Sequence, residues 1–320
     1  MKILITGGLG YIGSHIASLF GKSAVILDNL SNSKLNYKKI LPKCSIHIGE
    51  VNLRNLKKIF LKYKISGVIH MAGLKAVNES VRKPLNYYRN NIISSIELLE
   101  VMDMYNINKL IFSSSATVYG NNFKSPLGEK LDLQSNNPYG STKIIIENLI
   151  NDYCKSNLNF KAISLRYFNP IGADNKLGLK EMPLGQPQNL MPILINAAKN
   201  KKILKIYGSN YDTKDGTCIR DFIHVKDLAF AHKIAYEKLH KLTGHEKINL
   251  GLGKGISVLE LIKIFEKVNQ IKLKLKYVKR RRGDSAICYA NNSKALNMLD
   301  WKPKYTYEDM VKDAWEANAN

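Results

Sequence analysis

The stretch NPYGSTK, residues 137–143, places a tyrosine four residues before a lysine. Residues four apart share one face of a helix, so Tyr139 and Lys143 would be neighbours on a helix. A lysine ammonium favours the phenolate of a nearby tyrosine, and a phenolate can act as a general base. Exposed helix faces carry the same spacing, so the spacing alone does not separate a catalytic pair from two surface side chains.

A second chemical signal lies at the N-terminus, where Gly7, Gly10 and Gly13 follow the apolar run KILIT and open an amphipathic stretch over 11–20. In a strand–loop–helix unit the first glycine permits the tight turn, and the second lets the backbone approach a pyrophosphate. The third allows close packing of helix and strand. The helix N-terminus then faces the anion, so the loop predicts a dinucleotide site.

Asp28 ends the next apolar run, roughly 20 residues past the first glycine, where a carboxylate accepts hydrogen bonds from an adenosine ribose. A carboxylate at this place repels a 2′-phosphate, so the sequence favours NAD over NADP.

Three serines, Ser113, Ser114 and Ser115, end the fifth apolar run. The carboxyl ends of strands in a doubly wound sheet meet the cofactor cleft, so we expect these serines near a nicotinamide. The helix that starts at NPYGSTK would present Tyr139 and Lys143 to the same place. A tyrosine pKa is about 10 in water, and a nearby ammonium and the nicotinamide charge would lower it. The tyrosine could then take a hydroxyl proton while hydride leaves the same carbon for NAD⁺.

The elements that must position these groups alternate between strand and helix in the first half of the chain, which predicts a parallel sheet with right-handed crossovers. The expected fold is α/β, a doubly wound parallel (Rossmann) sheet with a smaller mixed α/β C-terminal substrate domain. We expect an NAD-binding domain over 1–170 and a substrate domain over 171–320, with the helix around 225–242 a candidate for return to the first domain. Long loops are expected at 170–192 and 209–225. Helices are predicted over 11–20, 84–104, 139–155, 225–242, 258–268 and 307–317.

Bulk composition narrows the class of protein. The 320 residues carry a formal net charge of +23. The lysines are scattered and only the run 279–284 is dense, so we favour general surface charge over nucleic-acid binding. The four cysteines are far apart, which favours free thiols in a reducing compartment over zinc or disulfides. No apolar run reaches the roughly 20 residues that span a bilayer, and the N-terminal run is too short for a signal peptide. We therefore expect a cytoplasmic protein without a metal site.

With these stretches in place, the sequence resembles the extended short-chain dehydrogenase/reductases, and among them the UDP-galactose (UDP-glucose) 4-epimerase family, over nearly its whole length. The resemblance implies reversible epimerisation of UDP-glucose and UDP-galactose through a 4-keto intermediate, with tightly bound NAD and no net redox change. The matching stretches are TGGLGYIGSH, LDNLSNSK, HMAGLKAVNESV, FSSSATVYG, NPYGSTK, LRYFNPIGA, NLMP, DGTCIRDFIHV, NLG and RRGD.

The resemblance also implies roles for single residues. Tyr139 would be the base, Ser115 would polarise the sugar O4, and Lys143 would hold the nicotinamide ribose and tune the tyrosine. Further cofactor contacts are implied for Gly7, Gly10, Tyr11, Ile12, Gly13, Asp28, Asn29, Glu50, Val51, Ala72, Lys75, Asn90, Ser113 and Tyr167. Substrate contacts are implied for Ser115, Ala116, Thr117, Asn169, Asn189, Leu190, Tyr207, Arg220, Arg281, Asp284 and Cys288. Arg280 and Arg282 would be surface charge.

Two positions depart from the family pattern. Glu50 stands where an aspartate is usual near the adenine. Cys288 stands at the far end of the sugar pocket, where a tyrosine restricts the resembled enzymes to glucose and galactose and a small residue admits an N-acetyl group. The resemblance therefore implies that UDP-GlcNAc and UDP-GalNAc are also interconverted; the alternative is a plain core cysteine.

Other readings stay open. A 4,6-dehydratase would need an acid beside the catalytic hydroxyl, but Ala116 and Thr117 follow Ser115. A UDP-glucuronate-type epimerase and a non-catalytic nucleotide-binding regulator remain alternatives. The helices starting near Pro84 and Tyr139 carry more apolar residues than one buried stripe needs, and the resemblance implies that they pair in a homodimer. These apolar residues are Ile92, Ile93, Ile96, Leu99, Ile144, Ile145, Ile146 and Leu149.

Overall fold

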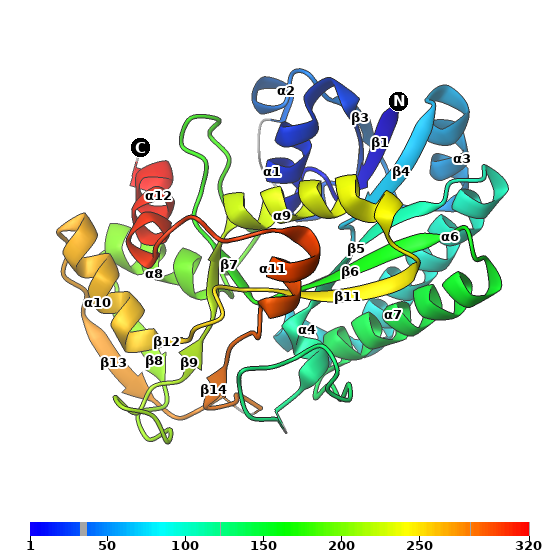
Figure 1. Cartoon of the computed structure of the whole chain (residues 1–320). Helices are drawn as coiled ribbons and strands as arrows, with labels where there is room; N and C mark the ends of the chain where they lie inside the picture. The colour runs from blue at the N-terminus through cyan, green and yellow to red at the C-terminus, as the bar shows by residue number, and fades with distance from the viewer. Residues whose placement is uncertain (33–36, 122, 282, 320) are drawn as a thin grey trace. The chain divides into compact units, whose positions relative to one another are not determined.

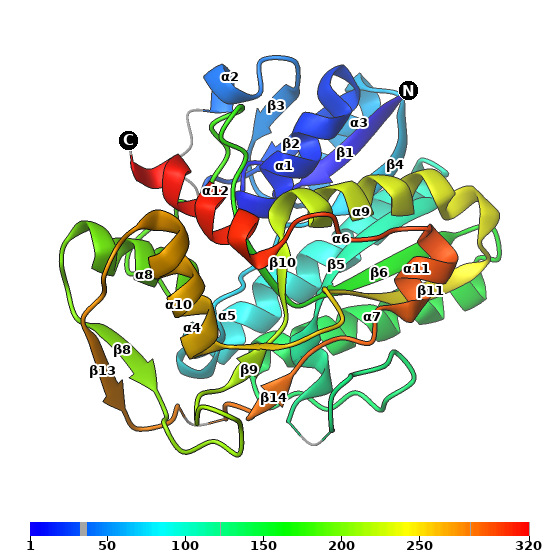
Figure 2. The same ribbon diagram turned by 60° about the vertical axis from the view of Figure 1, so that its left-hand side comes forward.

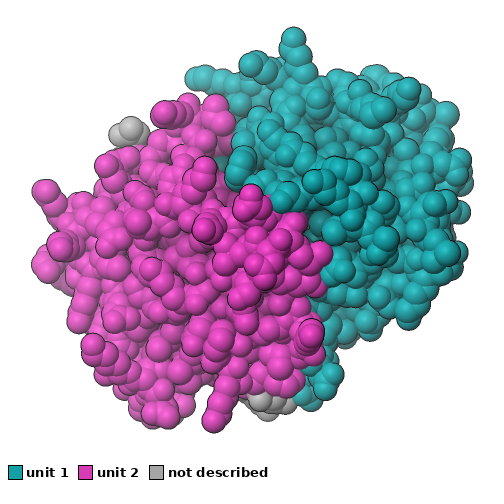
Figure 3. Space-filling model, viewed as in Figure 1, with its two compact units in different colours: residues 1–120, 132–166, 229–248 teal, residues 121–131, 167–228, 249–320 magenta. Residues whose placement is uncertain are grey.

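A computed structural model of the chain describes residues 1–32, 37–121, 123–281 and 283–319. Ser33, Lys34 and Arg282, which belong to the motifs above, lie outside the described residues. The chain forms two compact units, coloured separately in Figure 3. The first consists of 1–120, 132–166 and 229–248, and the second of 121–131, 167–228 and 249–320.

A seven-stranded sheet organises the first unit, in the order β11-β6-β5-β4-β1-β2-β3. The pairs β1–β2, β2–β3, β1–β4 and β4–β5 are parallel. The run 3-2-1-4-5-6 is the strand order of a doubly wound sheet, so the predicted fold class is confirmed. The run KINLG, placed after residue 170 in the expected substrate domain, lies in β11 and joins this sheet beside β6. The strands are β1 (Lys2–Thr6), β2 (Ala24–Asp28), β3 (Ser45–Ile48), β4 (Ile65–His70), β5 (Lys109–Ser115), β6 (Lys161–Tyr167) and β11 (Gly244–Leu250).

Helices cover the sheet on both faces (Figures 1 and 2). The predicted helix over 84–104 is three consecutive segments, because a π-helical turn interrupts it at Arg89–Ile93. The helix predicted at 225–242 ends as a 3-10 turn. The helices are α1 (Tyr11–Phe20), α2 (Tyr37–Ile40), α3 (Leu53–Lys62), α4 (Val77–Arg82), α5 (Pro84–Tyr88), α6 (Ser94–Met104), α7 (Pro138–Ser156) and α9 (Val225–Lys238). The 3-10 segments are η1 (Gly21–Ser23), η3 (Ala116–Tyr119) and η4 (Leu239–Lys241), and the π segment is η2 (Arg89–Ile93).

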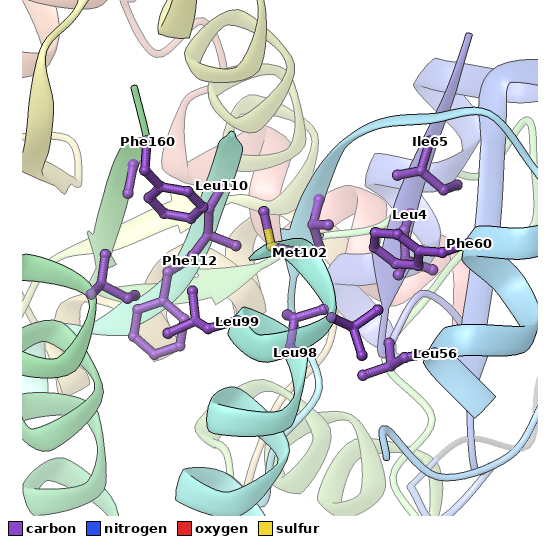
Figure 4. Close-up of a cluster of buried hydrophobic side chains, with 14 of the residues drawn as sticks. Leu4, Leu56, Phe60, Ile65, Leu98, Leu99, Met102, Leu110, Phe112 and Phe160 are labelled. Carbon is purple, nitrogen blue, oxygen red and sulfur yellow. The ribbon is translucent and has the colours of Figure 1, made fainter. Parts of the chain in front are cut away.

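The main apolar core lies between the sheet and the helices α3, α6 and α7 (Figure 4). Phe112 of β5, Leu99 of α6 and Ile146 of α7 are all at most 5% exposed in this core. Burying side chains of this size is worth about 1.5–3 kcal/mol each, so this packing holds α7 against the strand that ends in the three serines.

The second unit is built from short strands and three longer helices. Its core contains Met191, Phe222, Phe265 and Met310, all buried. Two short strands, β9 and β10, form within the predicted loop 209–225. The strand pairs are β7 (Asn169–Ile171) with β10 (Phe222–His224), β8 (Leu204–Tyr207) with β13 (Leu275–Val278), and β9 (Ile219–Arg220) with β12 (Ile256–Ser257) and β14 (Ile287–Cys288). The helices are α8 (Leu190–Lys199), α10 (Val258–Asn269), α11 (Ser293–Leu299) and α12 (Tyr307–Ala319).

Throughout the described ranges, no helix combines the length and the apolar character that crossing a bilayer requires. The four cysteines are free thiols, as the sequence led us to expect.

Candidate active site

The glycine loop joins β1 to α1, as predicted. Gly7 has a φ of +66°, and a Cβ there would lie 2.7 Å from the Ala72 amide nitrogen. A Cβ on Gly13 would lie 2.2 Å from the Gly7 carbonyl oxygen. Side chains at these positions would therefore push the loop off its neighbours. The first turn of α1 carries no acidic side chain and its N-cap, Gly10, supplies no side-chain cap, so this helix N-terminus is suited to an anion.

Asp28 ends β2 and is 8% exposed. Its carboxylate accepts hydrogen bonds from the backbone amides of Leu9, at 2.9 Å, and Leu30, at 2.8 Å. The acid therefore orders the glycine loop, a role that sequence reasoning missed. The Asn29 amide nitrogen lies 3.1 Å from a Glu50 carboxylate oxygen, so two of the expected cofactor residues are brought together beside Asp28.

Helix α7 begins where its sequence dictates. The Asn137 side chain accepts a hydrogen bond from the Gly140 amide at 2.9 Å, and Pro138 occupies the first turn. Asparagine is among the best N-cap residues, and proline is preorganised for the first helical position. Tyr139 and Lys143 therefore stand one turn apart near the start of a 19-residue helix.

The predicted serine, tyrosine and lysine are brought together in the first unit. Ser115, 9% exposed at the end of β5, lies near enough to the Tyr139 phenol to counteract the rise in the pKa of that tyrosine. The Lys143 ammonium lies 5.8 Å from the centroid of the Tyr139 ring. It donates a hydrogen bond of 2.6 Å to the Ser113 carbonyl oxygen. The Ser115 hydroxyl oxygen also accepts a hydrogen bond from the Thr117 amide at 3.2 Å.

In the protein alone, burial shifts the pKa values of Lys143 and Tyr139 so that both side chains favour their neutral forms. Burial lowers the pKa of Lys143 to about 8, although the nearby Glu147 carboxylate opposes this. Burial raises the pKa of Tyr139, and the nearby Ser115 opposes that. The expected lowering of the tyrosine pKa also requires the nicotinamide charge, so it stays a prediction for the NAD-bound protein. In the protein alone, desolvation outweighs the effect of Ser115 on the pKa of Tyr139.

The cofactor contact expected at Asn90 of YYRNN stays a prediction, and the next residue, Asn91, is buried. The Asn91 side chain accepts from the Leu74 amide at 2.8 Å and donates to the Thr142 hydroxyl at 3.1 Å. It thus ties the segment that carries Ala72 and Lys75 to α7. Asn91 lies in the π-helical segment η2, and π-turns are frequent at functional sites.

In the second unit, Arg220 and Cys288 are neighbours across the β9–β14 pair. Arg220 lies 3.8 Å from the Asp284 carboxylate. The Cys288 thiol is half-buried, and desolvation raises its pKa while Arg220 opposes the shift. Three expected substrate residues are thereby brought together.

Asp221 holds the cluster of Arg220, Asp284 and Cys288 in place. The sequence analysis did not identify this residue. Its carboxylate accepts hydrogen bonds from the amides of Leu252, Gly253 and Ala290 at 2.8–3.1 Å. Its backbone carbonyl accepts the Asn169 side-chain amide at 2.8 Å. No local sequence signal marks this role, because its three amide partners lie 31 to 69 residues away in sequence.

The remaining expected residues of the second unit are spread over several elements. The Arg281 guanidinium stacks 4.0 Å from the centroid of the Tyr207 ring. Asn189, directly before α8, is exposed and donates to Glu181 at 2.6 Å, and Leu190 opens that helix. Arg280 stacks over Tyr211 at 4.1 Å. The other expected residues lie as follows: Tyr11 and Ile12 in the first turn of α1, Val51 before α3, Lys75 exposed after β4, Ala116 in η3, and Tyr167 at the end of β6.

Comparison with known proteins finds that the chain is similar to nucleotide-sugar epimerases. The model of the family described as "NAD dependent epimerase/dehydratase family" matches residues 3–251. A UDP-glucose 4-epimerase of Dictyostelium discoideum is 44% identical over 98% of this chain and 95% of its own. The solved UDP-glucose 4-epimerase of Bifidobacterium longum, in complex with NAD⁺ and UDP, has a TM-score of 0.94 and 39% identity, over 100% and 98% of the two chains. The UDP-Glc/GlcNAc 4-epimerase of Campylobacter jejuni has a TM-score of 0.86 and 36% identity, over 99% of each chain.

Proposed function

Because the chain belongs to the NAD dependent epimerase/dehydratase family, we propose that it interconverts UDP-glucose and UDP-galactose through a 4-keto sugar with tightly bound NAD. One observation carries the proposal beyond family membership. A serine hydroxyl, a tyrosine phenol and a lysine ammonium converge at the carboxyl end of β5, where a doubly wound sheet presents its cofactor site. The 44% identity to a UDP-glucose 4-epimerase over nearly the whole chain supports the substrate class.

The residues of the first unit fit NAD. A cradle that only glycine can form at Gly7 and Gly13 lies at the N-terminus of α1. Asp28 keeps lone pairs for a ribose, and its charge disfavours a 2′-phosphate. NAD would supply the hydride acceptor for the sugar C4, and its positive ring would favour ionisation of Tyr139. Since burial alone raises the pKa of Tyr139, the phenolate depends on that bound charge and on Lys143.

The roles of this chain's own side chains follow. Tyr139 takes the proton of the sugar O4 hydroxyl as hydride leaves C4, and returns it to O4 after hydride is delivered to the other face. Ser115 donates to O4 and steadies its developing charge. Lys143 holds the nicotinamide ribose and favours the phenolate. The remaining proposed cofactor contacts are Gly10, Tyr11, Ile12, Asn29, Glu50, Val51, Ala72, Lys75, Asn90, Ser113 and Tyr167.

The second unit would hold UDP. Arg220 and Arg281 supply two guanidinium groups suited to a diphosphate, and Asp284 suits a ribose hydroxyl. Asn169, Asn189, Leu190 and Tyr207, with Ala116 and Thr117, complete the proposed substrate contacts. Firm binding at the UDP end lets the keto sugar turn about its link to the diphosphate. We place NAD binding mainly in the 1–170 domain and UDP-sugar binding mainly in 171–320.

The sugar range extends to N-acetylhexosamines in this proposal. Cys288 is small and half-buried and lies beside Arg220. A small side chain leaves room for an N-acetyl group. The similarity to a UDP-Glc/GlcNAc 4-epimerase supports the proposal without deciding it.

The proposal includes a cytoplasmic homodimer formed through the helices that start near Pro84 and Tyr139. Ile93 and Ile145 are 47% and 39% exposed, whereas Leu99 and Ile146 are buried in the core. Leu85, on α5, is 81% exposed. These exposed apolar side chains would be covered by the partner. The four free thiols suit a reducing compartment.

The decisive experiment releases and identifies the nucleotide that copurifies with the protein, and then assays UDP-galactose without added NAD. We expect NAD to be released and UDP-glucose to form. A protein that yields no NAD, or that leaves every UDP-hexose unchanged even with added NAD, would contradict the proposal.

A further inference from the structure

A buried charged network lies one helical turn beyond Lys143. The Arg166 guanidinium of β6 forms a two-point ion pair with the Glu147 carboxylate of α7, with N–O distances of 2.9 and 2.5 Å. Both side chains are at most 3% exposed. The Ser114 hydroxyl of β5 donates to the same carboxylate at 2.5 Å. Arg166 also donates to the Tyr119 hydroxyl at 3.0 Å.

This network joins the segments that carry the proposed catalytic groups. Ser114 precedes Ser115, Tyr119 closes the 3-10 turn that follows it, and Glu147 lies on the helix of Tyr139 and Lys143. Two adjacent contacts therefore fasten α7 to β5: the bond from Lys143 to the Ser113 carbonyl oxygen and the bond from Ser114 to Glu147.

Stability alone does not account for such a pair. Removing two charges from water costs several kcal/mol per ion, and apolar residues of similar volume often hold a fold equally well. We propose that Glu147 and Arg166 are positioning residues, which set α7 against β5 so that Tyr139 and Lys143 meet Ser115, and which keep Lys143 charged. The inference rests on the proposed function, because it assigns those three residues to the reaction.

The electrostatic part follows from the groups around the Lys143 ammonium. Glu147 is the carboxylate whose charge raises the pKa of Lys143 against the effect of burial. Without that charge the lysine would lose its proton at lower pH. The titratable groups that surround this region are Tyr139 and Glu147 on α7, His70 on β4, Tyr87 on α5, Tyr119 on η3 and Arg166 on β6.

The test compares three variants of the full-length, NAD-loaded protein. Glu147→Gln removes the charge and nearly keeps the shape. Glu147→Leu with Arg166→Met replaces the pair by apolar side chains. Tyr236→Phe is the matched control, because it removes a half-buried hydroxyl that bonds Ser66 of β4 at 3.1 Å in the same unit and makes no bond to the Glu147–Arg166 network. Each variant is assayed for kcat, KM, the pH profile of kcat and thermal unfolding.

We expect kcat of Glu147→Gln and of the double variant to fall about 100-fold, the size of loss that a 1 Å misplacement can cause, with KM for the UDP-sugar little changed. The alkaline limb of the kcat profile should move to lower pH in Glu147→Gln, and Tyr236→Phe should keep the wild-type profile. A folded double variant with wild-type kcat would overturn the inference, as would an unchanged alkaline limb in Glu147→Gln.

A second measurement separates this inference from the proposed function. The phenolate of Tyr139 is titrated by ultraviolet difference spectroscopy, with Tyr139→Phe as the reference. Its midpoint should move in Glu147→Gln and stay in place in Tyr236→Phe, whether or not the wild type turns over a UDP-hexose. A wild-type protein that turns over no UDP-hexose would contradict the proposed function. A Tyr139 titration midpoint that does not change in Glu147→Gln would contradict the positioning role. If the double variant does not fold, Glu147→Gln alone decides.

Discussion

The ammonium of Lys143 donates a 2.6 Å hydrogen bond to the carbonyl oxygen of Ser113, inside the core between α7 and β5. At 4% exposure, this lysine has a pKa of about 8 instead of the ordinary 10.5. Between those two values the unfolded chain binds more protons than the folded chain. The free energy of unfolding therefore rises with pH across this window, and below pH 8 the charged lysine costs about 3 kcal/mol.

Lys143→Met should consequently stabilise the protein while inactivating it. We expect the free energy of unfolding at pH 7 to rise by up to about 3 kcal/mol, and the gain to disappear by pH 10.5. Urea unfolding of wild type and variant at pH 7 and pH 10.5 measures the gain in unfolding free energy. Lys155→Met, at an exposed position on the same helix, is the control. A variant less stable than wild type at pH 7 would show that the bond to Ser113 outweighs the cost of burial.

Tyr139→Phe should remove the proposed base and keep the fold. General acid–base groups contribute about 10²–10⁴-fold to a rate, so kcat should fall by that factor while the amount of bound NAD stays the same. The kcat of Ser115→Ala should fall less, because the Tyr139 phenol keeps its place on α7. Initial rates with UDP-galactose and quantification of released NAD check both. Full turnover by Tyr139→Phe would exclude it as the base.

Cys288→Tyr should narrow the sugar range. The added ring would fill the space beside Arg220 that we assign to an N-acetyl group. Turnover of UDP-GalNAc should fall at least tenfold more than turnover of UDP-galactose. Cys288→Ser is the control, because it keeps a small side chain and should keep both activities. Wild-type inactivity on UDP-GalNAc, or equal effects of Cys288→Tyr on both sugars, would contradict the assignment.

Ile93→Glu and Ile145→Lys should weaken the proposed dimer. Both isoleucines are exposed in the single chain, so the charges should leave the monomer folded. Light scattering at micromolar concentration should give twice the chain mass for wild type and the chain mass for the double variant. Met104→Glu, at an exposed position on α6 outside the proposed interface, tests whether any added charge separates the dimer. A monomeric wild type would contradict the dimer.

Local patterns were sufficient to predict a doubly wound parallel sheet and the proposed catalytic cluster, but not that β11, from the expected substrate domain, joins this sheet. The glycine loop, the three serines and NPYGSTK each sit at the end of a strand or the start of a helix, and strand order then dictates which ends meet. The positions of Asn91, Glu147 and Asp221 could not be predicted in this way. Their partners lie 17 to 69 residues away in sequence, so only the folded chain shows what they hold. The strands β9 and β10 were missed because they are two and three residues long.

Asp221 should make the stability of the protein depend on pH in the acid range. Burial raises its pKa from 3.8 to about 6, although three backbone amides favour the carboxylate. Between pH 3.8 and about 6 the unfolded chain is ionised at this residue and the folded chain is protonated. The free energy of unfolding therefore falls as pH rises through this window, by about 3 kcal/mol in all, and then stays level.

Asp221→Asn tests this, because the amide stays neutral at every pH and its oxygen still accepts from the backbone. Relative to the variant, the wild type should lose about 3 kcal/mol of unfolding free energy between pH 4 and pH 7. Chemical unfolding at both values gives the difference, and Asp152→Asn, at an exposed position on α7, supplies the baseline. Parallel curves for wild type and Asp221→Asn would mean that the three amides fully offset burial. Asp221 would then hold β9, and with it Arg220, as a permanent carboxylate.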